Sequence, residues 1–278
     1  MIEEILIPVL ILLGAGLLVG LLLTICAKAF AVKTDPTVER LRETLPGINC
    51  GACGFAGCDE YAEKAVKDGV PIGLCVPGAD AVSIAMSRVL GVESVNVLAK
   101  KACISCHVCK TKETVEFEYR GVSSCRAAAS YYGGDRSCRF GCLGFGDCAS
   151  ACDYGAITMV DGYPVVNREK CTGCGKCAKT CPRRCIAVIP ESQRVTVACS
   201  NHDMGKKVMT VCNSGCIACG KCARVCPASA IQVQDGLAQV IYENCIACGK
   251  CVAACPTKCI LPLDPELSAK KETIEEKF

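Results

Sequence analysis

The sequence is poor in the residues that carry most enzymatic and nucleic-acid chemistry. It has no tryptophan, two histidines and 5% aromatic residues. Its 31 Lys and Arg nearly balance 28 Asp and Glu, and the net charge of +3 predicts no basic surface for nucleic acid. We expect His107 and His202 to face solvent or form hydrogen bonds rather than ligate metal. With only these two histidines, the sequence offers few candidates for catalysis by histidine. No flavin or dinucleotide fingerprint is present, which places any hydride chemistry on another chain.

Cysteine, by contrast, is in large excess, with 29 residues among 278. Such a share would suit a disulfide-rich secreted domain. However, the total is odd and no cleavable signal is evident. In the segments that begin at Cys171 and Cys245, three cysteines at short, regular intervals bring their sulfurs toward one point. This suits a polyhedral metal centre better than disulfides, and we expect reduced thiolates in a cytosolic environment.

The first 27 residues predict a transmembrane anchor. Residues 5–27 carry no charge and, at about 1.5 Å per residue, are long enough to span a bilayer core. A cleaved signal peptide is the alternative, but acidic residues stand where a basic region belongs. Basic residues follow the span at Lys28, Lys33, Arg40 and Arg42. The positive-inside rule therefore predicts a single-pass protein of the inner (cytoplasmic) membrane, with its soluble part in the cytoplasm.

The remainder predicts an α+β fold: a small helical 4Fe-4S domain followed by two tandem modules like bacterial two-cluster ferredoxins. In the helical domain, Cys50, Cys53, Cys58 and Cys75 are separated by two, four and sixteen residues, and we expect them to hold one cluster. The predicted boundaries are 1–27 for the anchor, 28–45 for a linker, 46–98 for the helical domain, 99–124 for a cysteine-rich connecting segment, 125–198 and 199–265 for the modules, and 266–278 for a charged tail.

An internal repeat defines the two modules. When the chain is shifted by 74 residues, ten cysteines fall on ten others, beginning with Cys125 on Cys199 and ending with Cys185 on Cys259. Non-cysteine residues follow at the same offset, including Pro182 on Pro256. The repeat therefore indicates a duplicated folded unit.

The second module has the full bacterial pattern C-x2-C-x2-C-x3-C-P, twice. In this pattern, the fourth cysteine of each run ligates the opposite cluster. The predicted ligand sets are Cys216, Cys219, Cys222 and Cys255 for one cluster, and Cys226, Cys245, Cys248 and Cys251 for the other.

The first module departs from the pattern at two positions. Phe145 stands in the place of Cys219, and Asp153 replaces the proline that follows the fourth cysteine. Enough thiols remain for two clusters. The predicted sets are Cys138, Cys142, Cys148 and Cys181, and Cys152, Cys171, Cys174 and Cys177.

Five clusters leave nine cysteines over. Cys103, Cys106 and Cys109 have triplet spacing, and Cys125 is the nearest fourth, so these four could hold a sixth cluster; Cys199 and Cys212 are alternative ligands. Of the others, we expect Cys26, Cys185 and Cys259 to be packed as apolar side chains. Zinc is the main alternative metal, but zinc ribbons use two cysteine pairs rather than triplets with a remote fourth.

Nearly the whole chain resembles the B subunit of the Rnf complex. The segments that carry the resemblance, besides the anchor and the second module, are 46–58, 119–125, 132–134 and 138–148. The unusual spacing from Cys138 to Cys152 is itself typical of that family, whereas Asp153 and the Cys103 to Cys109 triplet depart from it.

The resemblance implies a membrane-bound ferredoxin:NAD oxidoreductase coupled to sodium or proton translocation. It implies that this chain exchanges electrons with soluble ferredoxin and relays them to partner subunits that bind flavin and NADH. The chain would then be an electron-transfer subunit with four-iron clusters, five or six in number, and no substrate-converting site of its own. Two alternatives remain open: a stand-alone anchored polyferredoxin, and an iron-sulfur subunit of a membrane hydrogenase-type reductase. The sequence leaves the coupling ion, the electron direction and the route among clusters undetermined.

Overall fold

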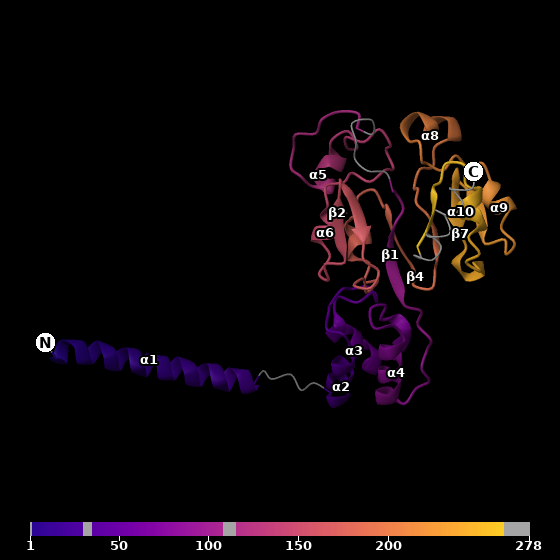
Figure 1. Ribbon diagram of the computed structural model, residues 1–278. Helices are drawn as coiled ribbons and strands as arrows, with labels where there is room; N and C mark the ends of the chain where they lie inside the picture. Colours follow the sequence, from indigo (N-terminus) through magenta and orange to yellow (C-terminus); the bar gives the residue numbers. More distant parts are fainter. Residues whose placement is uncertain (1, 30–34, 108–114, 264–278) are drawn as a thin grey trace.

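The computed structural model describes residues 2–29, 35–107 and 115–263. It mixes helices and short two-stranded sheets. Figure 1 shows a long N-terminal helix apart from the rest, a helical domain, and two strand-containing modules that lie side by side. Cys109 and the tail from residue 264 lie outside the described residues.

The N-terminal helix α1 (Ile2–Ala29) is uncharged from Ile5 to Ala27, with two acidic residues before this stretch and Lys28 after it. Its segment Val9–Cys26 has a mean hydropathy of 2.8, and none of it is buried against the protein. Within the described residues this is the one helix long and apolar enough to cross a membrane. By length and composition, α1 therefore fits the predicted anchor.

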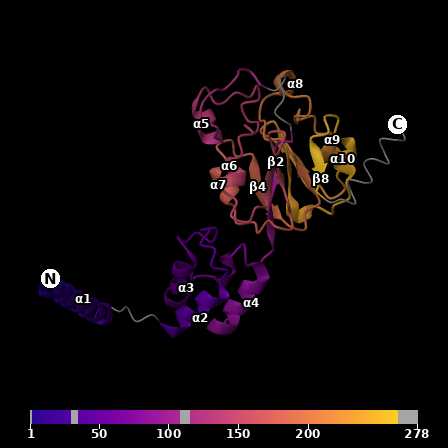
Figure 2. The same ribbon diagram turned by 60° about the vertical axis from the view of Figure 1, so that its left-hand side comes forward.

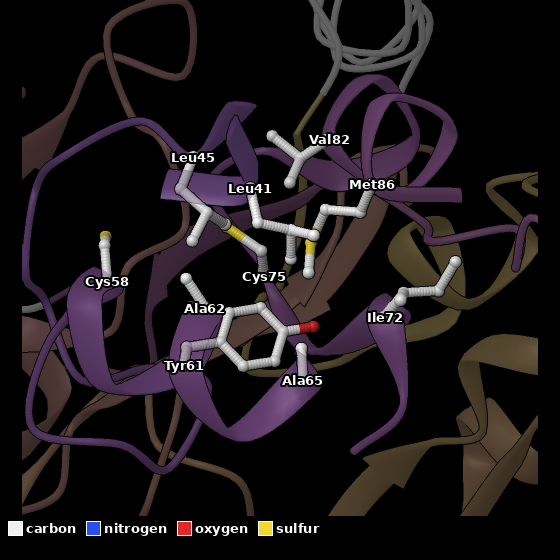
Figure 3. Close-up of a cluster of buried hydrophobic side chains, with 10 residues drawn as sticks. All are labelled: Leu41, Leu45, Cys58, Tyr61, Ala62, Ala65, Ile72, Cys75, Val82 and Met86. Carbon is white, nitrogen blue, oxygen red and sulfur yellow. The ribbon is translucent and has the colours of Figure 1, made fainter. Parts of the chain in front are cut away.

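The helical domain consists of α2 (Pro36–Thr44), α3 (Cys58–Lys67), a 3-10 turn η1 (Ile72–Leu74) and α4 (Ala79–Leu90). The side chain of Asp35 caps α2 by accepting a hydrogen bond from the Thr37 amide. Figure 3 shows the buried core, where Leu41, Tyr61 and Met86 converge from three helices. Cys58 and Cys75 belong to the same core, so the thiols are part of what the domain buries.

The two modules repeat one plan. The first contains α5 (Cys125–Ser130), α6 (Asp147–Ser150), the hairpin β2 (Ile157–Val160) and β3 (Tyr163–Val166), α7 (Lys176–Thr180) and β4 (Ile186–Pro190). The second contains α8 (Gly205–Val211), α9 (Lys221–Arg224), the hairpin β6 (Ile231–Gln234) and β7 (Leu237–Val240), a 3-10 turn η3 (Tyr242–Asn244), α10 (Lys250–Ala254) and β8 (Ile260–Pro262). Figure 2 shows both modules beside each other from a second direction, with the helical domain below.

Each module gains one further strand from the chain that precedes it. The strand β1 (Lys100–Ile104) pairs antiparallel with β4 of the first module, and β5 (Val195–Val197) pairs in the same way with β8 of the second. Strand pairing thus extends both modules toward the N-terminus, beyond the predicted boundaries at residues 125 and 199.

The strand register also changes which cysteines correspond. Ile104 pairs with Ile186, and Val197 pairs with Ile260, which is the counterpart of Ile186 in the repeat. Cys106 and Cys199 each lie two residues beyond the paired strand residue. The structural counterpart of Cys199 is therefore Cys106, although the sequence shift matches Cys199 with Cys125.

Candidate metal centres

The helical domain brings four thiols to one cavity. Cys50, Cys53, Cys58 and Cys75 line it together with apolar residues such as Leu45 and Tyr61. Cys58 is held at the first position of α3, where its amide donates a 2.8 Å hydrogen bond to the side-chain oxygen of Asn49. Burial raises the pKa of Cys75 to about 11. An uncharged thiol is favoured in such a site unless a cation compensates the thiolate.

The second module forms a comparable cavity beneath its hairpin. Cys216, Cys219, Cys222 and Cys255 line it, and Cys259 lines it as well. The Sγ atoms of Cys255 and Cys259 lie 3.5 Å apart. A hydrogen bond from the Cys259 thiol holds the pKa of Cys255 at about 5, so Cys255 is prepared to act as a thiolate.

The other predicted set of this module is arranged around α10. Burial raises the pKa of Cys251 to about 11, and repulsion from Cys245 and Cys248 adds to this effect. Cys226 follows α9, and its Sγ accepts a 3.2 Å hydrogen bond from the amide of Ala230. In the first module, Cys152 accepts the matching bond from Ala156, at 3.4 Å.

The first module packs its own thiols in two neighbouring groups. Cys171 and Cys177 share a core with Cys148, against which Cys152 and Cys181 also pack. Repulsion from Cys171 and Cys174 adds to the effect of burial, which raises the pKa of Cys177 to about 12. The amide of Ala102 in β1 donates to Cys171 Sγ at 3.3 Å, so the added strand supports this group.

In the other group of the first module, Cys125 lies close to Cys142 and Cys148. Burial raises the pKa of Cys142 to about 12 and that of Cys148 to about 11; the thiols of Cys106 and Cys125 add to the first shift, and those of Cys125 and Cys181 add to the second. Asp147, at the start of α6, fixes the position of Cys125 by accepting a 2.8 Å hydrogen bond from its amide.

Phe145 explains why a distant cysteine is needed there. It occupies the position of Cys219 in the repeat. It packs against the core of Cys125 and Leu143, and its ring centroid lies 5.6 Å from that of Tyr119. Cys125, at the start of α5, packs in the same core as Phe145 and brings a thiol to this region from outside the local run.

The members of the predicted sixth set are dispersed. Cys103 is buried within β1, opposite Ala187 of β4. Cys125 lies with Cys142 and Cys148. Cys106 instead lines a cavity with Cys199 and Cys212, the two alternative ligands of that set, and with Cys138, which the sequence assigns to another cluster.

All cysteines in the described residues are free. In the same residues, no three His, Cys, Asp or Glu side chains converge closely enough for a single metal ion. A zinc ion with four thiolates needs sulfurs about 3.8 Å apart, given Zn–S bonds of about 2.3 Å. Cavities that are each lined by at least four thiols offer the four ligands that a 4Fe-4S cluster takes. The two histidines bond to backbone carbonyls, His107 to Ala198 and His202 to Asp235, as predicted.

Family models match three segments. Residues 45–77 match a family described as an Fe-S cluster, and residues 170–230 and 208–256 each match a 4Fe-4S dicluster domain. The 170–230 match crosses the junction between the two modules. Thiol-lined cavities under short hairpins, together with these matches, define an iron-sulfur electron-transfer protein with 4Fe-4S clusters.

Curated relatives define the family more closely. The chain is 42% identical, over 87% of its length and 73% of the relative, to the B subunit of the Na(+)-translocating ferredoxin:NAD(+) oxidoreductase complex of Acetobacterium woodii. It is 40% identical, over 84% of its length and 89% of the relative, to the B subunit of the ion-translocating oxidoreductase complex of Methanosarcina acetivorans. The B subunit of a proton-translocating ferredoxin:NAD(+) oxidoreductase complex from Clostridium ljungdahlii is 38% identical, over 81% of this chain and 80% of the relative. The chain belongs to the B subunits of ion-translocating oxidoreductase (Rnf) complexes, and it is an iron-sulfur electron-transfer subunit of that family.

Proposed function

We propose that this chain is a membrane-anchored subunit that moves electrons between soluble ferredoxin and the flavin-bearing and NADH-binding subunits of an ion-translocating ferredoxin:NAD oxidoreductase. The observation that carries the proposal is the set of thiol-lined cavities on a chain 38% to 42% identical to three such B subunits. One relative is named for sodium and another for protons. The proposal therefore concerns the ion-translocating class rather than either ion.

We infer at least five four-iron clusters. When bound, each supplies the uptake and release of one electron. The inferred ligands are Cys50, Cys53, Cys58 and Cys75; Cys125, Cys142, Cys148 and Cys181; Cys152, Cys171, Cys174 and Cys177; Cys216, Cys219, Cys222 and Cys255; and Cys226, Cys245, Cys248 and Cys251. The second set takes Cys125 where the sequence predicts Cys138, because Asp147 holds the Cys125 amide beside Cys148, whereas Cys138 lines a different cavity.

The anchor would hold these centres at the cytoplasmic face of the inner membrane. Lys28 lies in the last turn of α1, and Arg40 and Arg42 follow in the next helix. Basic residues on this side of a span favour a cytoplasmic location for the domains on the C-terminal side of the span.

The helical domain, which follows the anchor in sequence, meets the first module at its thiols. Lys179 donates a 3.3 Å hydrogen bond to the carbonyl of Gly51, between Cys50 and Cys53. Burial raises the pKa of the Tyr154 hydroxyl in the first module, and the thiols of Cys174 and Cys50 add to this rise. This contact would bring the thiols of the two domains near enough for electron transfer.

The far end of the second module offers a surface for a soluble donor. Cys219 and Cys248 are exposed, and the neighbouring Ile246 is 63% exposed. Lys221 and Lys250 lie next to these thiols in sequence and are exposed. Two exposed lysines close to exposed thiols would favour a negatively charged partner and would make its association rate depend on salt.

Purification in mild detergent with co-expressed neighbouring subunits tests the proposal. We expect the assembly to reduce NAD with reduced ferredoxin, and we expect the rate to fall when Lys221 and Lys250 are both changed to Glu. A stable single chain that gives no NAD reduction even with its neighbours would instead favour a stand-alone polyferredoxin.

A further inference from the structure

We propose that Cys106, Cys138, Cys199 and Cys212 hold a further four-iron cluster at the junction of the two modules. The inference rests on the proposed function for the chemistry of the cluster. The sequence offers Cys106, Cys199 and Cys212 among the candidates for a sixth cluster, and the fold selects these three and adds Cys138. The set draws two thiols from each module, and it includes a thiol, Cys138, that the sequence assigns elsewhere.

The four thiols line one cavity. They are related by the internal repeat: Cys138 and Cys212 correspond in sequence, and Cys106 and Cys199 correspond through the strand register. The amide of Cys142 donates to Cys106 Sγ at 3.5 Å, and the amide of Cys216, its repeat counterpart, donates to Cys199 Sγ at 3.2 Å. The two modules therefore contribute the same pair of positions to opposite sides of one cavity.

The polar groups around the cavity suit thiolates. Asn201 is 2% exposed; its side-chain nitrogen donates to Cys138 Sγ at 3.4 Å, and its amide donates to Cys199 Sγ at 3.5 Å. Arg136 is 5% exposed and lines the same cavity. Hydrogen bonds to sulfur and a nearby buried cation both stabilise the negative charge of a thiolate-ligated cluster.

The modules are also docked tightly around this cavity. Ser200 of the second module donates a 3.0 Å hydrogen bond to the carbonyl of Phe140 in the first. Arg139 and Asp203 form an ion pair of 2.7 Å across the same junction. A cluster held by two thiols from each side would add its binding free energy to this interface.

The site would connect the inferred clusters into a single row. On one side, Cys106 contacts the amide of the ligand Cys142, and on the other Cys199 contacts the amide of the ligand Cys216. An electron accepted from either neighbour would be passed to the other, so no bond or proton would change. The two modules would then act as one continuous conductor rather than as two separate ones.

The test compares anaerobically prepared full-length chains. We expect about 24 irons in the wild type and about 20 in the Cys138→Ala/Cys212→Ala double variant, because a four-iron cluster is lost. One signal should disappear from the redox-poised electron paramagnetic resonance spectrum while the others persist. The matched control is Cys103→Ala. It removes a buried thiol of the same region, from a residue of β1 that lies opposite Ala187 of β4, and this variant should retain all of the iron.

A milder variant covers the case in which the double variant does not fold. Asn201→Ala should keep about 24 irons and lower the midpoint potential of one cluster only, since the side-chain donor to Cys138 Sγ is removed while the backbone amide still donates to Cys199 Sγ. About 20 irons in the wild type, with no loss in the double variant, would overturn the inter-module site but leave the proposed function standing. Protein that contains no iron-sulfur clusters would overturn both.

Discussion

Cys185 and Cys259 occupy the same place in the two modules, four residues after Cys181 and Cys255. The sequence suggests packed apolar thiols, and both are buried. Their contacts indicate a further role. A hydrogen bond from Cys185 is the main reason that the pKa of Cys181 falls to about 6, and Cys259 lowers the pKa of Cys216 to about 6 in the same way. Each thiol therefore interacts with the sulfur of an inferred ligand, and Cys185 also donates a 3.1 Å hydrogen bond to the carbonyl of Phe140.

Replacement of Cys259 by alanine should change the potential of one cluster without removing it. The loss of an S–H donor to Cys255 destabilises the more negative, reduced state, so the midpoint potential should fall. Redox titration followed by electron paramagnetic resonance measures this. Cys103→Ala serves as the control and should leave all potentials unchanged. A loss of about four irons from the Cys259 variant would mean that Cys259 is itself a ligand.

A second prediction at the residue level concerns the assignment of Cys125, rather than Cys138, as a cluster ligand in the first module. Cys125→Ala should remove about four irons per chain, because Cys125 supplies the thiol that Phe145 cannot. The double variant Cys125→Ala/Phe145→Cys should regain them, since it restores the spacing found around Cys219. Iron analysis of the two variants decides the question. Full iron in the single variant would contradict this ligand assignment.

At the level of elements, the cysteine runs and the duplicated module could be predicted from the sequence because they depend on spacing along the chain. The strands β1 and β5 could not, since they pair with strands far away in the chain. The 74-residue shift also matches Cys199 with Cys125, whereas the strand pairing identifies Cys106 as the structural counterpart of Cys199. The sequence therefore offered Cys106, Cys199 and Cys212 as candidates for a sixth cluster but could not select them or add Cys138, because the strand pairing that relates Cys106 to Cys199 is long-range.

Because β1 lies close to the loop between Cys171 and Cys174, we expect that substitution of Gly173 lowers the stability of the protein strongly. Its φ is +70°, and a Cβ there would lie 2.2 Å from the carbonyl oxygen of Lys100. Gly173→Ala should therefore lower stability by about 3 kcal/mol or more, from backbone strain together with a backbone clash. Gly155→Ala is the matched control, because its φ is +57° but no atom lies within 4 Å; it should cost about 1 kcal/mol. Anaerobic thermal unfolding compares the stabilities of the two variants. Equal losses of stability would show that β1 does not pack closely against this loop.

At the level of the whole molecule, α1 is separate from the folded domains in both views (Figures 1 and 2). The cores of the helical domain and of the two modules are built without residues from α1. Deletion of residues 1–34 should therefore release the protein from membranes while its iron content stays unchanged. Sedimentation of membranes followed by iron analysis of both fractions checks this. A truncated chain that remained with the membranes would contradict the role of α1 as the main attachment.

The central claim is that the thiol-lined cavities hold four-iron clusters. The most direct test is to measure iron, acid-labile sulfide and zinc in one anaerobic preparation of the full chain. The account predicts equal amounts of iron and sulfide, at about 20 or more of each per chain, with only traces of zinc. Colourless protein, or protein that contains zinc in place of iron and sulfide, would contradict it.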